Sequence, residues 1–286
     1  MNSSSARAAL RNSLEGDGCG YVASVFDPVS ARIAKDVGYG TGILAGSAAS
    51  LSVLGAPDLV LLTMTELVEQ ARRICRAAPD FPLIVDADHG YGNALNVRRV
   101  VEDLEAAGVA GLTIEDTNLP ASADYDTSGG LISLEAGLGK IEAALHARRD
   151  DAFVIIARTA AATLSDADDA ARRCRAYERA GADAVFLTGV KCREDVETVS
   201  RKVKCPVILG SLPSDMQGLD YDGVRLMLGG HNPVRKAIAA LYDAMLEEAK
   251  VRGIFSAKDC AGDADELLRR LTLTDQYGNW KRDFLR

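Results

Sequence analysis

The stretch LIVDADHGYGNALNVRRVVEDLEAAGVAGLTIED, residues 83–116, decides the fold of this chain. It opens with an apolar run at Leu83–Asp88, continues with helical periodicity over Ala94–Ala107, and closes with a second apolar run at Gly111–Glu115. The Ala107-Gly108 pair before the second run is a signal that ends a helix. A buried strand, an amphipathic helix and another buried strand in this order predict the crossover unit of a parallel sheet.

The same unit repeats along the rest of the chain. Apolar runs of strand length occur at Tyr21–Phe26, Gly42–Gly46, Leu83–Asp88, Gly111–Glu115, Phe153–Thr159, Ala184–Gly189, Pro206–Gly210 and Val224–Gly229. The runs begin on average about 29 residues apart, which suits a strand followed by a crossover helix. Because the runs are apolar throughout and no linker divides the chain, we predict an α/β fold, one (β/α)8 TIM barrel over residues 1–286.

Both ends of the chain carry segments beyond the strand repeat. Residues 1–19 are expected to form an N-terminal helix, and residues 234–286 a C-terminal helical extension. The extension has helical patterns at Val234–Lys250 and Asp263–Leu271, and it contains the single tryptophan, Trp280. Surplus terminal helices commonly pack on a second subunit, so we expect a homo-oligomer.

Composition and charge limit the classes of partner. The chain has 33 Lys and Arg against 41 Asp and Glu, a formal net charge of −8, and no run rich in basic residues. Nucleic-acid and membrane partners are therefore not expected, because both require a concentrated basic or apolar surface. The N-terminus lacks an apolar signal segment, which favours a cytoplasmic location, and the six cysteines form no CxxC pair. A small-molecule site is the remaining expectation.

Three acids end two neighbouring strands of the predicted barrel. Asp86 and Asp88 are two residues apart, so their side chains share one face of a strand, and Glu115 ends the next strand. In a TIM barrel these strand ends form the active site. Converging carboxylates repel one another unless a cation lies among them, and an all-oxygen set suits Mg²⁺ or Mn²⁺. For Asp116, which follows, the alternative is an ordinary cap of the next helix.

Three further side chains are placed at the same end of the barrel. Arg158 follows an apolar run, and its planar fork suits a substrate carboxylate; an ion pair with Glu115 or another acid is the compatible alternative. Ser47 begins a small-residue segment whose hydroxyl and N–H groups suit an anionic oxygen. His231 follows two glycines at the end of the last strand, opposite the acids, whereas His146 is expected on a helix surface.

The strings DADHGYGN (86–93), GLTIED (111–116) and IART (156–159) together resemble the phosphoenolpyruvate mutase/isocitrate lyase superfamily. The likeness extends over roughly residues 23–250, which is essentially the barrel. It implies a barrel whose eighth helix is swapped between subunits, commonly in a dimer of dimers. That assembly agrees with the surplus helices at the C-terminus.

The resemblance also implies roles for individual residues. Mg²⁺, or Mn²⁺ in its place, would be held directly or through water by Asp86, Asp88 and Glu115. The two ends of an α-keto or α-hydroxy acid would be bound by Arg158 and by the segment Gly46, Ser47 and Ala48. In the branch of the superfamily that this chain resembles most, a histidine at the position of His231 is also expected to contact the substrate.

Departures from the superfamily pattern indicate which branch this is. Lyases of the superfamily carry Lys-x-Cys-Gly-His after the fourth strand, but residues 118–131 contain no cysteine, lysine or histidine. The mutases carry a histidine after the sixth strand, where this chain has Thr188. The string ASVFDP (23–28) and the Gly-His pair at the last strand resemble the oxaloacetate decarboxylase branch instead. Ala160 departs from this pattern too, because Asn or Asp is usual there.

The sequence therefore predicts Mg²⁺-dependent decarboxylation of a 2-oxo diacid, with oxaloacetate giving pyruvate and CO₂ through an enolate. The alternative is a carbon–carbon lyase acting on a substituted malate or a methylisocitrate-type substrate. A lyase needs an acid/base group, and in the absence of the loop cysteine only Tyr125 or Glu135 would supply it. A third hypothesis is a non-catalytic binding barrel in which Ala160 marks a decayed site, but the retained acids and Arg158 speak against it.

Overall fold

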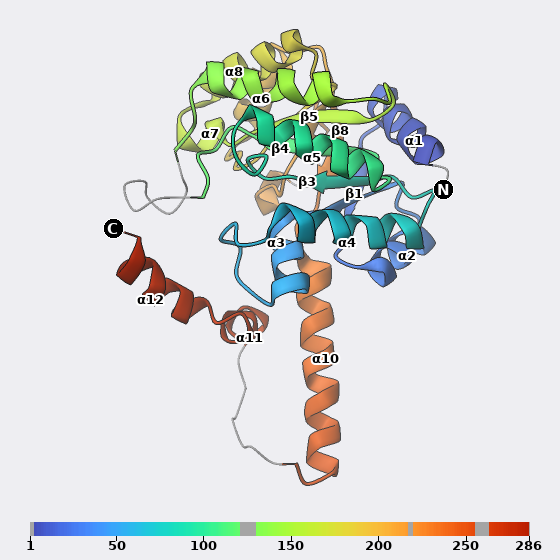
Figure 1. Ribbon diagram of the computed structural model, residues 1–286, viewed down its shortest axis with the longest axis vertical. Helices are drawn as coiled ribbons and strands as arrows, with labels where there is room; N and C mark the ends of the chain where they lie inside the picture. The colour runs from blue at the N-terminus through green and yellow to red at the C-terminus, as the bar shows by residue number, and fades with distance from the viewer. Residues whose placement is uncertain (1–2, 121–129, 217–219, 255–262, 286) are drawn as a thin grey trace.

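The computed structural model describes residues 3–120, 130–216, 220–254 and 263–285 (Figure 1). Parallel strands close into a barrel in chain order, so that the first strand pairs with the last. The strands are β1 (Gly20–Ser24), β2 (Thr41–Leu44), β3 (Leu83–Asp86), β4 (Gly111–Glu115), β5 (Val154–Thr159), β6 (Ala184–Leu187), β7 (Val207–Leu209) and β8 (Val224–Leu228). The predicted (β/α)8 barrel is confirmed.

Helices between the strands cover the outside of the barrel, and further helices lie at both ends of the chain (Figure 1). They are α1 (Ser3–Glu15), α2 (Pro28–Val37), α3 (Gly46–Ala49), α4 (Met64–Ala77), α5 (Ala94–Ala106), α6 (Leu134–Ala147), α7 (Ala161–Leu164), α8 (Ala167–Ala180), α9 (Arg193–Ser200), α10 (Asn232–Val251), α11 (Ala264–Leu271) and α12 (Thr274–Phe284). A π-helical turn, Ser50–Leu54, continues α3. The helical patterns predicted at Val234–Lys250 and Asp263–Leu271 correspond to α10 and α11.

Several strands end one or two residues before the predicted limits. β3, for example, ends at Asp86 rather than at Asp88, because Asp88 has left-handed backbone geometry (φ 45°) and leaves the sheet. β1 ends at Ser24, and Asp27 then caps α2 by accepting a hydrogen bond from the Ser30 amide. The residues that leave the ladder form the mouth of the barrel.

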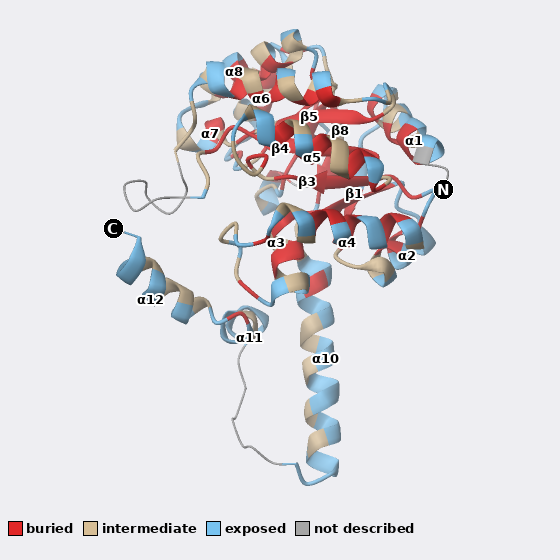
Figure 2. Cartoon of the chain, in the orientation of Figure 1, coloured by how far each residue is buried: buried red, intermediate tan, exposed pale blue. Residues whose placement is uncertain are grey.

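The interior of the barrel is filled by side chains rather than open. A buried cluster that includes Val22, Ile156 and Phe186 occupies the centre, and Leu10 and Leu14 of α1 complete it from one end. Figure 2 shows the buried residues concentrated in the barrel strands and the inner faces of the surrounding helices. Because α1 closes the N-terminal end, a ligand has access at the opposite end, where the strands finish.

Arg7 connects α1, the helix that closes the N-terminal end, to the barrel through hydrogen bonds. Its guanidinium donates to the carbonyl oxygens of Val109 (3.1 Å) and Glu105 (2.6 Å) and to the Asp150 carboxylate (2.6 Å), and the residue is only 5% exposed. We expect Arg7→Met to lower the free energy of unfolding by about 3 kcal/mol, because buried acceptors lose their donor. Urea denaturation measures this loss.

Arg73→Met is the matched control for that experiment. Arg73 pairs with Glu69 on the exposed face of α4, with both side chains half open to solvent. Its removal is expected to change stability by less than about 0.5 kcal/mol. Equal losses in the two variants would contradict the role given to Arg7.

The C-terminal helices leave the body of the barrel. α10 extends away from it, α11 lies beside α10, and α12 packs on α11 (Figure 1). Within the helix itself only Val234 is buried, whereas Leu241 and Met245 are 57% and 62% exposed (Figure 2). On the barrel, the apolar residues Val29 and Ile33 of α2 are exposed as well. The molecule thus presents uncovered apolar surface both on α10 and on α2.

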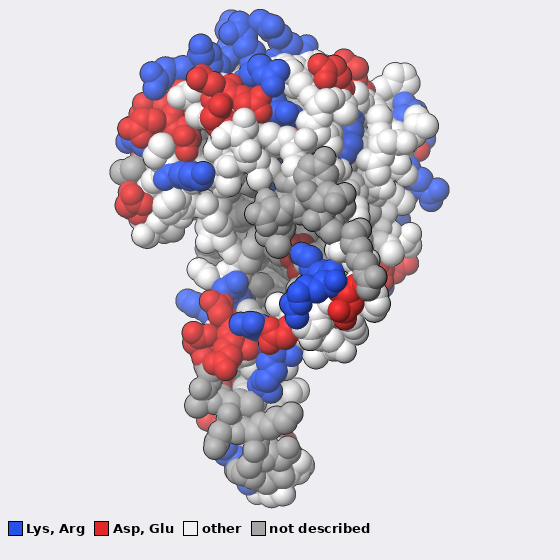
Figure 3. Space-filling model, turned by 90° about the vertical axis from the view of Figure 1, so that its left-hand side faces the viewer, with Lys and Arg blue, Asp and Glu red and all other residues white. Residues whose placement is uncertain are grey.

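Charges are mixed over the surface. On the face shown in Figure 3, Lys and Arg lie interspersed with Asp and Glu over both the barrel and the region below it. None of the helices in the described part of the chain is long and apolar enough to cross a membrane. Cys75 and Cys174 are buried free thiols, and Cys260 lies outside the described residues.

Candidate active site

A cavity of about 410 Å³ lies at the C-terminal ends of the strands and is bordered by most of the predicted site residues. Those that line it are Ser47, Asp86, Asp88, Glu115, Arg158 and His231. A larger hollow, about 750 Å³, lies beside α1 and α2 near the other end, but the residues described around it include no carboxylate, histidine, lysine or arginine. The chemistry therefore points to the smaller cavity.

Asp86 is the most heavily bonded of the acids. Its carboxylate accepts from the Thr113 hydroxyl (2.8 Å) and from Nη1 of Arg158, which approaches both oxygens (2.8 and 2.6 Å). The Asp88 amide donates to the same carboxylate at 3.3 Å. Asp86 is thus fixed in place by β4, β5 and its own turn.

Arg158 lies between two of the acids. Besides Asp86 it approaches Glu115, with Nη2 3.4 Å from Oε2, because Glu115 and Arg158 are register partners on β4 and β5. Burial alone would lower the pKa of Arg158, but Asp86, Glu115 and Asp88 together raise it, so the guanidinium stays charged. The structure therefore contains the expected ion pair between Arg158 and the neighbouring acids. A contact between Arg158 and a substrate carboxylate remains a prediction.

Asp88 has a different environment from Asp86. Among the described residues its carboxylate has neither a hydrogen-bond donor nor an ion-pair partner. Burial raises the pKa of Asp88 well above its ordinary value, and repulsion from Asp86, Glu115 and Asp58 raises it further. Arg158 lowers the pKa of Asp88 without contacting it, so Asp88 is a half-buried acid with no direct partner in the described part of the chain.

Asp58 is a fourth acid of the cavity that the strand-end rule missed. It lies at the rim on the loop after the π-helical turn, with part of its side chain open to solvent. Partial desolvation and the charge of Asp86 raise its pKa. No strand precedes Asp58 directly, and only the proximity of the loop to β3 in space brings it here.

The charges of this cavity do not balance. Four carboxylates and one guanidinium give a formal charge of −3 when all of them are ionised, and burial raises the pKa of Glu115 as well as that of Asp88. In the part of the chain that the structure describes, no three acidic, histidine or cysteine side chains are close enough to form a direct ligand set. Mg²⁺ is usually held by one or two carboxylates and several waters, so the donor set fits a water-rich Mg²⁺ site centred on Asp88.

Small residues allow Asp88 to reach this position. A Cβ on Gly46 would lie 2.6 Å from Oδ1 of Asp88, and one on Gly90 would lie 2.3 Å from Cγ2 of Val97. Gly90 also has a φ of 81°, so the turn that carries Asp88 requires glycine there. Gly46 and Ala48 themselves are buried in α3 and do not line the cavity.

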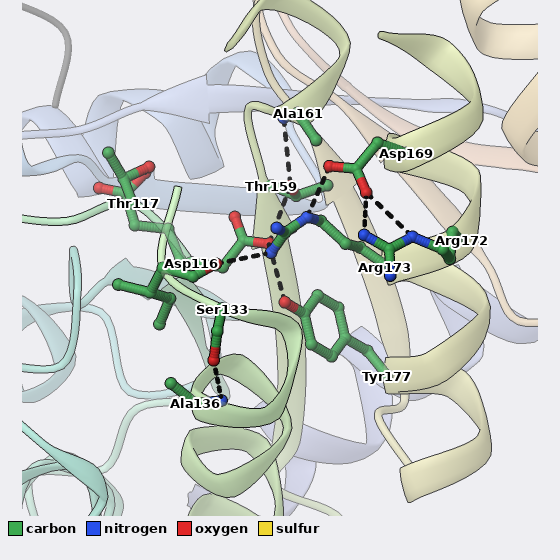
Figure 4. A network of polar contacts seen from close by, with 12 residues as sticks. Asp116, Thr117, Ser133, Ala136, Thr159, Ala161, Asp169, Arg172, Arg173 and Tyr177 are labelled. Atoms are coloured by element: carbon green, nitrogen blue, oxygen red, sulfur yellow. Dashed lines mark hydrogen bonds and ion pairs between the residues drawn. The ribbon is translucent and has the colours of Figure 1, made fainter. Parts of the chain in front are cut away.

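Asp116 lies behind the cavity, and its expected role as a helix cap is wrong. The cap of α6 is Ser133, whereas the Asp116 carboxylate accepts from Thr159 (3.1 Å), Arg173 (3.1 Å) and Tyr177 (2.7 Å). Figure 4 shows these donors converging on it. The long connection between β4 and α6 separates Asp116 from the helix that it was expected to cap. The network instead ties β4 to β5 and α8 just outside the acids.

The histidines occupy three different surroundings. His231 lines the cavity, and its Nδ1 lies 2.7 Å from the hydroxyl of Ser24. His89 is buried in a neighbouring cavity, where burial and Lys140 lower its pKa to about 4. Lys140 donates to the His89 carbonyl oxygen at 2.7 Å and so braces the turn after Asp88. His146 is exposed on α6, as predicted.

The phosphoenolpyruvate phosphomutase family matches the chain over residues 10–249. The chain belongs to this family. It is 50% identical over 244 residues to a Bradyrhizobium diazoefficiens protein named oxaloacetate decarboxylase, with 84% of each chain covered. It is 47% identical over 283 residues to an oxaloacetate decarboxylase from a strain of Rhodopseudomonas palustris, covering 98% of this chain and 96% of the relative.

Solved structures of the same superfamily share the whole fold. The 2,3-dimethylmalate lyase, described as a PEP mutase/isocitrate lyase superfamily member, superposes with a TM-score of 0.76 at 28% identity and covers 97% of this chain and 98% of its own. A phosphonopyruvate hydrolase complexed with oxalate and Mg²⁺ gives 0.76 at 29% identity, with 98% and 99% covered. The superfamily predicted from the sequence motifs is confirmed, and these members are enzymes.

Proposed function

We propose that this enzyme decarboxylates a 2-oxo diacid, with oxaloacetate as the leading substrate, to give pyruvate and CO₂ in a Mg²⁺-dependent reaction. The observation that carries the proposal is the half-buried acid Asp88, which has no direct partner among the described residues, in a cavity with an excess of acidic side chains. A dianionic substrate would be repelled from this cavity unless a cation joined it. Relatives named oxaloacetate decarboxylase at 47% and 50% identity support the choice of substrate.

Asp88 would hold the cation directly, while Asp86, Glu115 and Asp58 would hold its water ligands. The bound cation would supply a Lewis acid that stabilises the negative charge developing on the substrate as CO₂ leaves. Arg158 keeps Asp86 and Glu115 oriented and offers its remaining N–H groups to a substrate carboxylate. Ser47 and His231, which line the cavity, would donate hydrogen bonds to the substrate's oxygens.

Neither residue expected to serve as the acid/base group of a lyase is found among the described residues of the cavity. Glu135 is exposed in the first turn of α6 and does not line the cavity, and Tyr125 lies outside the described residues. Solved relatives nevertheless include a 2,3-dimethylmalate lyase and an oxaloacetate acetylhydrolase, the latter 26% identical with a TM-score of 0.77 and 98% and 97% coverage. Product analysis must separate these reactions.

The test is an assay of the purified enzyme with Mg²⁺ and a panel of acids, with all products identified. Oxaloacetate should be converted to pyruvate and CO₂ well above the spontaneous rate, whereas 2,3-dimethylmalate and 2-methylisocitrate should remain intact. Acetate and oxalate formed from oxaloacetate would indicate hydrolysis instead. Cleavage of the malate or isocitrate derivatives would favour the lyase.

His231→Gln should reduce kcat for oxaloacetate by roughly 10²-fold, the scale typical of a positioned polar or acid/base group. Steady-state kinetics and the thermal midpoint are measured on one preparation. If His231 only supports the loop after β8, the variant loses about 1 kcal/mol of stability and the folded enzyme keeps its kcat. That outcome would remove His231 from the site.

We further propose that α10 is exchanged between subunits in a dimer of dimers, in which the extension 234–286 serves assembly. The exposed apolar residues of α10 and α2 support this exchange, since such surface is costly in water. Leu241→Glu with Met245→Glu should shift the light-scattering mass to a smaller species. An unchanged tetramer, or a monomeric wild-type protein, would contradict it. The cytoplasmic location stays a prediction.

A further inference from the structure

The ring of His231 is held by one buried hydroxyl. Ser24 is the last residue of β1, only 6% exposed, and its Oγ lies 2.7 Å from Nδ1 of His231. β1 and β8 are neighbours in the barrel, with Val22 opposite Leu228. His231 follows β8 and Gly230, whose φ of 82° turns the chain back toward the end of β1. The closure of the barrel therefore sets this contact.

The acceptors within reach of Ser24 decide which group donates in the hydrogen bond between Ser24 and His231. If Nδ1–H donated to Ser24, the hydroxyl proton of Ser24 would need a second acceptor. Among the described residues the Ser24 hydroxyl has no partner besides His231. A buried hydroxyl without an acceptor costs about 1–3 kcal/mol, so the favoured arrangement has Ser24 donating to an unprotonated Nδ1. The ring proton is then on Nε2.

The ring is also kept neutral. Burial lowers the pKa of His231; Arg235 and Arg158 lower it too, while Asp86 opposes them. A neutral imidazole carries one proton, so the nitrogen bonded to Ser24 fixes the character of the other nitrogen. Because Nδ1 is already engaged, Nε2 is the ring nitrogen available to a ligand in the cavity.

We propose that Ser24 is a positioning residue that fixes His231 as the Nε2–H tautomer, which makes His231 a hydrogen-bond donor toward the substrate. The donor role rests on the proposed function, because a 2-oxo diacid presents only acceptor oxygens and a decarboxylation places growing negative charge on one of them. An acceptor nitrogen at Nε2 would repel that charge. The tautomer itself depends only on Ser24 and His231.

The first test uses the wild-type enzyme. The full-length protein is labelled with ¹⁵N, and the ring nitrogens are observed in a long-range ¹H–¹⁵N spectrum, where protonated and bare nitrogens are well separated. Only three histidines are present, and His231→Gln assigns the signal of interest. We expect a bare Nδ1 and a protonated Nε2 at neutral pH. A protonated Nδ1 with a bare Nε2, or a fully charged ring, would overturn the proposal.

The second test separates positioning from stability. Ser24→Ala should give a mixture of tautomers and a kcat about 10-fold lower, with the Mg²⁺ concentration for half-maximal activity unchanged. Ser24→Thr retains the hydroxyl and should restore the Nε2–H form and most of kcat. Ser13→Ala is the matched control, since its hydroxyl bonds the Ala9 carbonyl oxygen on α1 at the closed end. It should leave both readouts unchanged.

The outcomes also separate this proposal from the proposed function. Decarboxylation with a single Nε2–H tautomer in Ser24→Ala would remove Ser24 from its positioning role and leave the function intact. A wild-type protein with the expected tautomer but no decarboxylase activity would contradict the proposed function alone. If Ser24→Ala and Ser24→Thr both fail to fold, the wild-type spectrum still decides the tautomer.

Discussion

Asp88→Asn is expected to lower kcat/KM for oxaloacetate by roughly 10³-fold or more and, at the same time, to stabilise the metal-free protein. The substitution keeps the shape of the side chain and removes a half-buried carboxylate that has no direct partner among the described residues. The pKa of Asp88 is higher in the folded chain than in the unfolded chain, so its charge destabilises the metal-free fold above roughly pH 4. The gain in thermal midpoint should therefore be present at pH 7 and absent near pH 4.

The same variant should lose the stabilisation that Mg²⁺ gives the wild type, because a ligand stabilises only the state that binds it. Asp27→Asn is the matched control. Asp27 also follows a barrel strand but caps α2, and asparagine caps helices as well as aspartate does. Its kinetics and Mg²⁺ response should equal those of the wild type. A metal-free Asp88→Asn protein that is less stable than the wild type at pH 7 would refute the account of charge repulsion.

Arg158→Lys should reduce kcat/KM by roughly 10²-fold with the barrel intact. Lysine keeps the positive charge but cannot bond both oxygens of Asp86 and also approach Glu115. The two acids would then reorient, and the apparent affinity for Mg²⁺ should fall together with kcat. Kinetics over a range of Mg²⁺ concentrations measure both quantities.

Arg172→Lys serves as the control for that change, because Arg172 pairs with Asp169 on the exposed side of α8. It should have no measurable effect on activity. A kcat/KM within about twofold of the wild type in Arg158→Lys would restrict Arg158 to a general charge-balancing role.

The barrel and much of the candidate site are predictable from the sequence for physical reasons. Parallel strands buried on both faces have apolar residues throughout, and their polar ends point to one mouth. That rule brings Asp86, Asp88, Glu115, Arg158 and His231 to one cavity. The strand limits are less predictable, since positive φ at Asp88 ends β3 early, and backbone angles are not visible in a pattern of apolar residues.

The features of the site that the sequence did not predict depend on contacts between segments that are distant in sequence. Asp58 joins the acids only because its loop folds over β3, and Asp116 meets Tyr177 from a helix 61 residues away. Arg158 lies between the acids because of the register of β4 and β5.

The most direct test of the cation-dependent site is pyruvate formation from oxaloacetate by wild-type enzyme stripped with EDTA and dialysed, before and after Mg²⁺ is added. Spontaneous decay is subtracted with protein-free samples that contain the same Mg²⁺, since the free ion itself accelerates the reaction. The stripped enzyme should form pyruvate at a rate near background. Added Mg²⁺ or Mn²⁺ should restore the full rate in the wild type but not in Asp88→Asn. Full decarboxylation by the stripped enzyme with excess chelator would contradict the cation-dependent site.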